Sequence, residues 1–233
     1  MAAPLTGPLA TAATPAPPTG FDRVAWCYDA LADLVFGRAL QRAQRAALAG
    51  LPAGTPHVLI LGGGTGWVLT EVLRQRPGAT LLYLEASPRM LARARAQLAQ
   101  TLPAAGGQVE FRHGTQQALS PGESFDAVIT FFVLDCIAQP DMPAALAQLR
   151  AAQRPGAPWL LADFRPAQRG WRWVLLRLMY AFFRLTTGLR ARDLPDLRRA
   201  LGQLGLREIS HQFFFGRAVE ALVLVEPPAG GNT

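Results

Sequence analysis

The sequence predicts an α/β fold, a three-layer sandwich in which a mostly parallel sheet of seven strands lies between two layers of helices. Short apolar segments alternate with longer segments of helical periodicity, a pattern typical of a parallel sheet covered on both faces. A turn with three alternating glycines joins the first predicted strand to a helix. Near the C-terminus, two apolar segments around a tight turn at Gly216 predict an antiparallel hairpin.

The expected elements follow in order along the chain. Residues 21–49 contain two helices, separated near Gly37. Five strands are expected at residues 57–61, 80–85, 108–113, 127–131 and 159–163, and the hairpin strands at residues 207–215 and 218–225. Helices are expected at residues 67–75, 88–101, 143–153 and 194–204. Ser87 and Pro88 mark one helix start, because Ser caps a helix N-terminus well and Pro suits the first turn.

Length and composition predict one domain. With 233 residues, 50% of them hydrophobic, the chain is long enough to bury one substantial core. Residues 1–20 are rich in proline and lack the basic start and unbroken apolar core of a signal peptide, so we expect a disordered tail. Residues 21–233 then form the single domain, with helices over residues 21–50 and a helical insertion at residues 165–192.

The glycine turn predicts a binding site for a nucleoside-bearing cofactor. Gly62, Gly64 and Gly66 lack a Cβ, so the backbone can adopt positive φ and approach a ligand closely. A dinucleotide site of the G-x-G-x-x-G type is disfavoured, because the third glycine would fall at Trp67 in one register and at Leu69 in the other. The spacing G-x-G-x-G therefore indicates a different cofactor.

An acidic residue at the end of the next strand supports this interpretation. Glu85 lies about twenty residues beyond the glycines, where a carboxylate can accept hydrogen bonds from both hydroxyls of a ribose. The alternative is an ordinary surface carboxylate at a strand end. The glycine turn upstream favours the binding role.

Together these motifs resemble those of the class I S-adenosylmethionine-dependent methyltransferases, which have a Rossmann-like fold. Glu85, Ala86, Ser87 and Pro88 match the second family motif, and residues 125–137 and 149–164 resemble the family's fourth and fifth strands with their neighbouring segments. Residues 21–37 are similar to the N-terminal helix of the methyltransferases that act on ubiquinone and menaquinone precursors. The resemblance implies S-adenosylmethionine as cofactor, held by Gly62, Gly63, Gly64, Thr65, Gly66, Glu85, Ala86, Thr115, Gln116, Phe131 and Tyr28.

Two positions depart from the family pattern. The family usually has an acid two residues before the first glycine, where it helps to hold the methionine amine, and this chain has Ile60. After the third strand the family commonly has Gly-Asp, whose carboxylate accepts from the adenine amino group, whereas this chain has Gly114 followed by Thr115 and Gln116. A hydroxyl or amide oxygen accepts the same hydrogen bond at a cost of about 1 kcal/mol. We interpret this as a diverged enzyme.

Charge and cysteine content exclude several classes. The net charge of +7 comes from arginines alone, without lysine, and these are dispersed and accompanied by no nucleic-acid-binding motif. We therefore expect a solvated Arg-rich surface and no nucleic-acid partner. Cys27 and Cys136 are too few and too isolated for a disulfide framework or a zinc site, so no metal is expected and a reducing, cytoplasmic compartment fits.

The segment Trp171–Thr187 has three interpretations. Its apolar residues nearly surround the helix, and Arg172, Arg177 and Arg184 interrupt it too often for a membrane span of about twenty residues. It could be an interfacial helix that contacts the inner face of the membrane, a lid over an apolar acceptor, or a buried core helix. Its position after the fifth strand is where the family places elements that cover the acceptor.

The predicted function is methyl transfer to a small organic acceptor, apolar and quinone-like by preference. The catalytic base is unknown. Asp135, in the loop after the fourth strand, is the first candidate, and a helix cap or solvated carboxylate is its ordinary role; His113, His211 and Tyr180 are weaker candidates. Alternatives are methylation of a polar metabolite at oxygen or nitrogen, or a non-catalytic, membrane-associated S-adenosylmethionine-binding protein. A nicotinamide-dependent oxidoreductase is disfavoured by Trp67, and the oligomeric state is left open.

Overall fold

The structure is a computed structural model that describes residues 36–165 and 197–227. The predicted N-terminal tail, the first N-terminal helix, Tyr28 and Cys27 lie outside these ranges, as do Tyr180 and the segment Trp171–Thr187. The boundaries expected for the tail and for the helical insertion therefore stay predictions.

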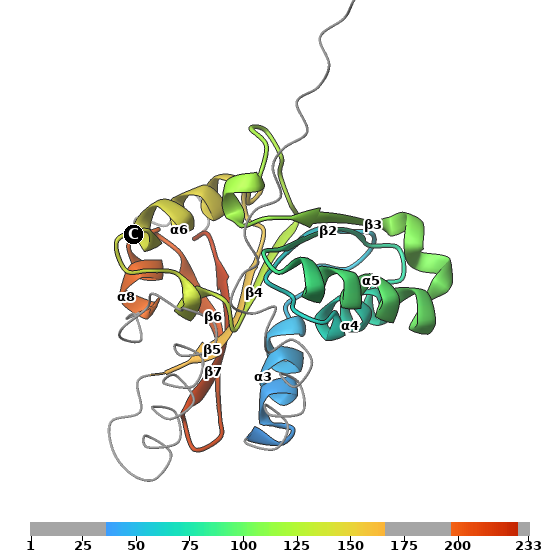
Figure 1. Cartoon of the computed structure of the whole chain (residues 1–233). Coiled ribbons are helices and arrows are strands. Elements are labelled where there is room, and N and C mark those ends of the chain that lie inside the picture. The colour runs from blue at the N-terminus through green and yellow to red at the C-terminus, as the bar shows by residue number, and fades with distance from the viewer. Residues whose placement is uncertain (1–35, 166–196, 228–233) are drawn as a thin grey trace, which may run out of the picture.

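Seven strands form one sheet, as the alternation of apolar and helical segments predicts (Figure 1). They are β1 (His57–Leu61), β2 (Thr80–Glu85), β3 (Val109–His113), β4 (Ala127–Phe131), β5 (Trp159–Phe164), β6 (Arg207–Phe214) and β7 (Val219–Val225). Their order in the sheet is β3-β2-β1-β4-β5-β7-β6. The first five strands run parallel, and β7 is antiparallel to both β5 and β6, which confirms the predicted terminal hairpin.

The strand order predicts that a ligand binds at the carboxyl ends of β1 and β4. From β1 the chain proceeds outward through β2 and β3, and then returns to add β4 and β5 on the other side of β1. In open parallel sheets, ligands bind at this reversal of strand order, beyond the carboxyl ends of the strands. The glycine turn lies there, directly after β1.

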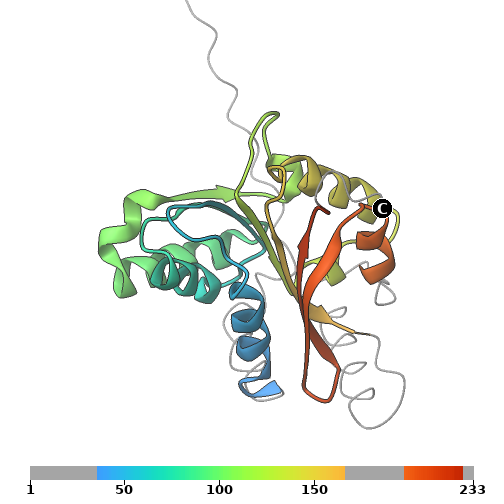
Figure 2. The same cartoon turned by 180° about the vertical axis from the view of Figure 1, so that it is seen from behind.

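Helices cover both faces of the sheet (Figures 1 and 2). One face carries α3 (Ala39–Leu48), α4 (Trp67–Gln75) and α5 (Pro88–Thr101), and the other carries α6 (Met142–Ala151) and α8 (Leu197–Gly202). Short 3₁₀ helices occur at η1 (Pro103–Gln108), η2 (Gln116–Ala118) and η3 (Leu134–Cys136). Ser87 caps α5 as predicted, because its hydroxyl accepts from the Met90 amide at 3.1 Å.

Three predicted ends of strands or helices were wrong by one or two residues. Gln108 belongs to η1 instead of the third strand, and its side-chain amide donates to the carbonyls of Pro77 and Ala79. The helix expected at residues 143–153 ends at Ala151, since Gln153 forms a parallel bridge with Phe125. The helix expected to reach residue 204 ends at Gly202, ahead of a turn in which Gly205 adopts a φ of +71°.

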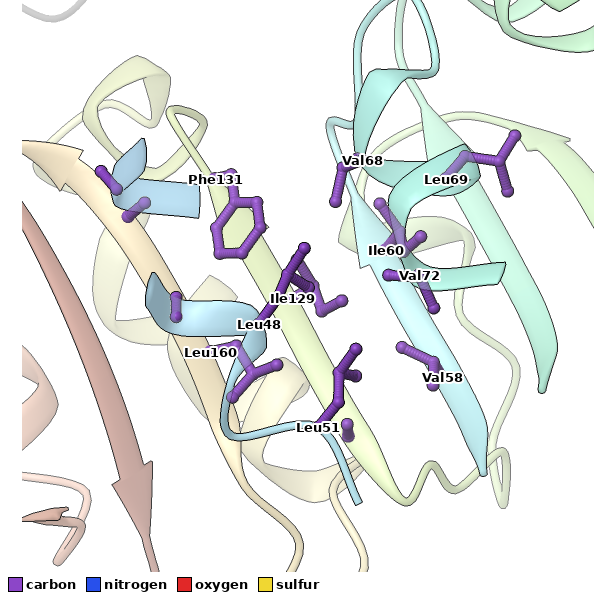
Figure 3. Close-up of a cluster of buried hydrophobic side chains, with 14 of the residues drawn as sticks. Leu48, Leu51, Val58, Ile60, Val68, Leu69, Val72, Ile129, Phe131 and Leu160 are labelled. Carbon is purple, nitrogen blue, oxygen red and sulfur yellow. The ribbon is translucent and has the colours of Figure 1, made fainter. Parts of the chain in front are cut away.

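Alternation along each strand divides the core into two apolar clusters. Figure 3 shows the cluster beneath α3 and α4, where Ile60 faces Val68, Leu69 and Val72 of α4. Ile60 is only 1% exposed. The side chain that stands where the family has an acid therefore belongs to the hydrophobic core.

Within the described ranges, no helix combines the length and hydropathy that a membrane span requires.

Candidate functional site

The glycine turn occupies the carboxyl end of β1 with a backbone that favours glycine. Gly62, Gly64 and Gly66 have φ of +66°, +63° and +104°, all in the left-handed region that side chains disfavour. Gly66 is the N-cap position of α4, so the turn leads directly into that helix. The amide groups at the helix start therefore face the region where a ligand would bind.

The glycines of this turn differ in what surrounds them. A Cβ on Gly62 would lie 2.4 Å from Val133, one on Gly63 would lie 2.5 Å from the Tyr83 ring, and one on Gly66 would lie 2.9 Å from the Ala94 backbone. A Cβ on Gly64, in contrast, meets no described atom within 4 Å. Three of the glycines thus permit packing against β2, the loop after β4 and α5, and Gly64 borders open space that a cofactor can fill.

Hydrogen bonds hold the turn against β2. The Gly62 amide donates to the Leu84 carbonyl at 2.8 Å, and the Tyr83 hydroxyl donates to the Gly64 carbonyl at 2.9 Å. The Gly64 amide donates to Oε2 of Glu85 at 3.0 Å. The position of the glycine backbone is therefore set by the end of β2.

Glu85 is a buried carboxylate with two backbone donors. Its Oε1 accepts from the Ser87 amide at 2.9 Å while Oε2 accepts from Gly64, and the residue is 6% exposed. Burial raises the pKa of Glu85 above its usual value, and hydrogen bonds from backbone amides, with the proximity of His113, offset part of that rise. Each carboxylate oxygen has a second lone pair, so the group can still accept from the two hydroxyls of a ribose.

The remaining predicted contacts lie around the end of β3. The Gly114 amide donates to the Glu85 carbonyl at 2.9 Å, which brings the Thr115–Gln116 segment beside Glu85. The Thr115 hydroxyl caps η2 by accepting from the Gln117 amide. Ala86 contributes its carbonyl, which lies 2.9 Å from Nε2 of His113.

The loop after β4 forms the other side of the site. Phe131 is 5% exposed and packs in the apolar cluster below α3 (Figure 3). Phe132 adopts a φ of +53°, a conformation that costs about 1–2 kcal/mol for a residue with a side chain. Its amide donates to the Ala162 carbonyl at 2.8 Å, so β5 holds the bend. The bend places Val133 against Gly62.

Two acids lie behind this loop. Asp135 in η3 is 5% exposed, and Asp163 at the end of β5 is fully buried. The Cys136 thiol donates to Oδ1 of Asp135 at 3.4 Å, and burial together with the charge of Asp135 raises the pKa of that thiol. From the sequence we placed Asp163 at the end of the fifth strand but did not predict it as a site residue, although an acidic residue after the buried run Trp159–Ala162 is the signal that could have identified it.

The two histidines considered as bases lie in different surroundings. His113 is exposed beside Glu85. His211 on β6 contacts two carboxylates, with Nε2 3.0 Å from Glu220 and Nδ1 3.3 Å from Glu208. Its neighbours indicate a charge network on the hairpin. The structure brings Asp135, and not His211, next to the loop that packs on the glycine turn.

Comparison with known protein families shows what this part of the chain is similar to. Residues 59–158 match the family described as "Methyltransferase domain", a range that spans the glycine turn, Glu85 and the loop after β4. Residues 59–158 therefore form a methyltransferase domain. The cofactor of such methyltransferases is S-adenosylmethionine. In this chain Gly64 borders space that no described atom fills, and its amide donates to the Glu85 carboxylate.

Two curated relatives are similar over part of the methyltransferase. The ubiquinone biosynthesis O-methyltransferase of Paramagnetospirillum magneticum is 29% identical over 126 residues, which are 54% of this chain and 48% of the relative. The demethylmenaquinone methyltransferase of Thermus thermophilus is 32% identical over 152 residues, 64% of this chain and 66% of the relative. The chain thus spans about half the length of the first relative and just under two thirds of the second.

Solved structures confirm the fold of the methyltransferase. Mitomycin 7-O-methyltransferase MmcR superposes with a TM-score of 0.63 at 20% identity, over 82% of this chain and 55% of that one. The N-methyltransferase NodS from Bradyrhizobium japonicum, solved in complex with S-adenosyl-L-homocysteine, has a TM-score of 0.60 at 15% identity and covers 82% and 88% of the two chains.

Replacing Gly64 with alanine should abolish cofactor binding while the protein still folds. The added Cβ meets no described protein atom within 4 Å. It should therefore clash with the bound cofactor and reduce cofactor affinity, without a clash inside the protein. The positive φ of Gly64 also adds backbone strain of about 1 kcal/mol. Gly54→Ala is the matched control, because Gly54 has a φ of +82° and equally empty surroundings but precedes β1, at the opposite end of that strand from Gly64.

Calorimetric titration with S-adenosylhomocysteine and thermal unfolding measure the two effects. Both variants should lose similar stability, and only Gly64→Ala should lose binding. Equal affinity in the two variants would contradict this role of Gly64.

Cofactor affinity should weaken on acidification, and Glu85 should be the cause. The pKa of Glu85 is raised, so Glu85 takes up a proton at a higher pH than an exposed glutamate and then no longer accepts from both ribose hydroxyls. Glu85→Gln should bind about ten- to a hundredfold more weakly near neutral pH. It should also lose the acid-dependent decrease in affinity.

The control is Glu110→Gln, which removes an exposed carboxylate that pairs with Arg112 on β3. This variant should keep the wild-type affinity and pH dependence, measured by calorimetry. If Glu85→Gln kept the wild-type pH dependence of cofactor affinity, a titratable group other than Glu85 would be its cause.

Proposed function

We propose that the chain catalyses methyl transfer from S-adenosylmethionine to a hydroxyl or enolic carbon of a small, apolar, quinone-like acceptor. The observation that carries the cofactor part is the joint presence of open space at Gly64 and a buried, doubly hydrogen-bonded Glu85. The acceptor class is supported by the two curated relatives, whose names refer to ubiquinone and demethylmenaquinone.

The proposed cofactor contacts come from the glycine turn and from the residues at the ends of β2 and β3. Glu85 accepts from the ribose, and the turn that includes Gly63 and Thr65 passes beneath the ligand. Thr115 and Gln116 lie beside Glu85, where an adenine would continue from the ribose. Ala86, Phe131 and Tyr28 complete the proposed set.

S-adenosylmethionine supplies an activated methyl group, so the protein must mainly orient the acceptor and exclude water. The bend at Phe132 positions the loop after β4 against the glycine turn and brings Asp135 to the same region. We propose Asp135 as the group that takes the acceptor's proton. A phenolic or enolic acceptor needs such a base, because its neutral form is a weak nucleophile.

A panel of acceptors tests this assignment by release of S-adenosylhomocysteine. The probes are 1,4-dihydroxynaphthalene, 3,4-dihydroxybenzoate and the polar amine glycine. Methylation of the aromatic hydroxyl compounds, lost in Glu85→Ala and reduced at least about a hundredfold in Asp135→Asn, is the expected result. Methylation of the amine alone would favour a polar metabolite as substrate.

Tight cofactor binding without turnover of any probe would instead favour a non-catalytic binding protein. The core position of Ile60, where the family has an acid, is the observation that favours this second function.

Contact with a membrane surface is a separate proposal about the segment Trp171–Thr187. Its aromatic residues and arginines suit the boundary of an anionic bilayer, where an apolar acceptor would dissolve. The full chain should float with vesicles that contain phosphatidylglycerol, and Trp171→Ala combined with Trp173→Ala should reduce the bound fraction. Equal recovery of both proteins with anionic vesicles would contradict membrane contact through these tryptophans.

A further inference from the structure

Among the described residues, Asp163 is a buried acidic residue with a carboxyl oxygen that has no hydrogen-bond partner. It is fully buried at the carboxyl end of β5, next to β4 on one side and β7 on the other. Its Oδ1 accepts from the Phe164 amide at 2.8 Å, whereas Oδ2 has no hydrogen-bond partner. A buried carboxylate oxygen without a partner is unfavourable, and a proton on it removes the charge and creates a donor.

The groups that face Asp163 are mostly negative. Asp135 lies in η3, which packs against β5. Its charge disfavours ionisation of Asp163, whereas its backbone amide donates a hydrogen bond to the Asp163 carboxyl. Glu220 stands opposite Asp163 in the antiparallel register of β5 and β7. Glu220 has its own partners, since its Oε2 lies 3.2 Å from Arg165 and 3.0 Å from His211. Asp135 is thus the neighbouring negative charge that acts most strongly on Asp163.

We propose that Asp163 and Asp135 form a carboxyl pair that holds a single proton, with the proton on Asp163 and the negative charge on Asp135. Two nearby carboxyl groups in a dry region cannot both ionise, so one keeps its proton. Asp163 is the more buried of the two and has the unpartnered oxygen. Burial and the Asp135 charge accordingly hold the pKa of Asp163 well above its usual value.

The pair gives Asp163 the role of a positioning residue for Asp135. A neutral acid beside a carboxylate stabilises the ionised form of that carboxylate and fixes its orientation. The Cys136 thiol makes a further contact to Oδ1 of Asp135 at 3.4 Å. Asp135 is therefore kept as a base in the loop that packs on Gly62 through Val133.

The catalytic use of the pair rests on the proposed function. In that reaction the acceptor oxygen bonds to the methyl carbon, the methyl–sulfur bond breaks with its electrons on sulfur, and the hydroxyl proton passes to Asp135. The proton on Asp163 is not consumed, and Asp135 returns its proton to water after product release.

Carbon-13 NMR of protein labelled at the aspartate carboxyls tests the pair without an acceptor. The carboxyl signals are followed from about pH 4 to about pH 9, and Asp163→Asn or Asp163→Glu assigns the signal of Asp163. We expect Asp163 to remain protonated at neutral pH. Asp135→Asn should lower its midpoint by at least one pH unit, about a tenfold change in the proton's binding constant.

The matched control is Glu220→Gln, which also replaces a buried carboxylate facing Asp163 by an amide. Its effect on the midpoint should be smaller, because Arg165 and His211 already balance the charge of Glu220. Titration of Asp163 near pH 4 in the wild type would overturn the proposal. So would an Asp163 midpoint that Asp135→Asn leaves in place.

Cofactor binding separates this proposal from the proposed function. Asp135→Asn and Asp163→Asn should bind S-adenosylhomocysteine as the wild type does, because neither carboxyl is one of the ribose acceptors. A wild-type protein that binds no S-adenosylhomocysteine but shows a protonated, Asp135-dependent Asp163 would refute the methyltransferase activity and leave the carboxyl pair standing.

Discussion

The carboxylate of Glu85 is the interaction on which the site depends. It accepts from Gly64 in the turn after β1 and from Ser87 at the start of α5, so one side chain joins two connections of the parallel sheet. Burial of this charge is unfavourable by itself, which the raised pKa of Glu85 reflects. The two backbone donors offset that cost in part, and the lone pairs that remain are those a ribose would use.

The same constraint explains the conformation of the glycine turn. To reach Glu85, the backbone must pass close to Tyr83, Ala94 and Val133, and no side chain fits at Gly62, Gly63 or Gly66. Glycine is therefore needed at these positions for packing against the protein itself. Gly64 alone of this group has no described atom within 4 Å of the position of a Cβ, and its φ of +63° is the feature that favours glycine there.

Much of this could be predicted from the sequence, because the signals are local. The glycine spacing, the acid at the end of the second strand and the Ser87–Pro88 helix start each depend on neighbours within a few residues. The mostly parallel sheet followed from the alternation of elements, and the antiparallel hairpin followed from the two apolar segments around Gly216. The ends of the helix over residues 143–153 and of the third strand were missed, since Gln153 and Gln108 bond to residues distant in the chain.

The acidic pair could not be predicted for a related reason. Asp135 and Asp163 lie 28 positions apart in the sequence, and only the parallel pairing of β4 and β5 brings them together. Likewise, the contact between Val133 and Gly62 depends on the left-handed bend at Phe132, which no sequence pattern announced. Ile60 is the converse case. Its departure from the family pattern was visible, and the structure supplies the reason, a place in the core against α4.

A crystal structure with S-adenosylhomocysteine bound tests the proposed role of Glu85 most directly. Both ribose hydroxyls should lie within hydrogen-bond distance of the Glu85 carboxylate, and the ligand should contact the Gly64 backbone where a Cβ would stand. The thioether sulfur should then face the loop after β4. A ligand bound elsewhere, or a ribose that leaves Glu85 bonded only to Gly64 and Ser87, would contradict it.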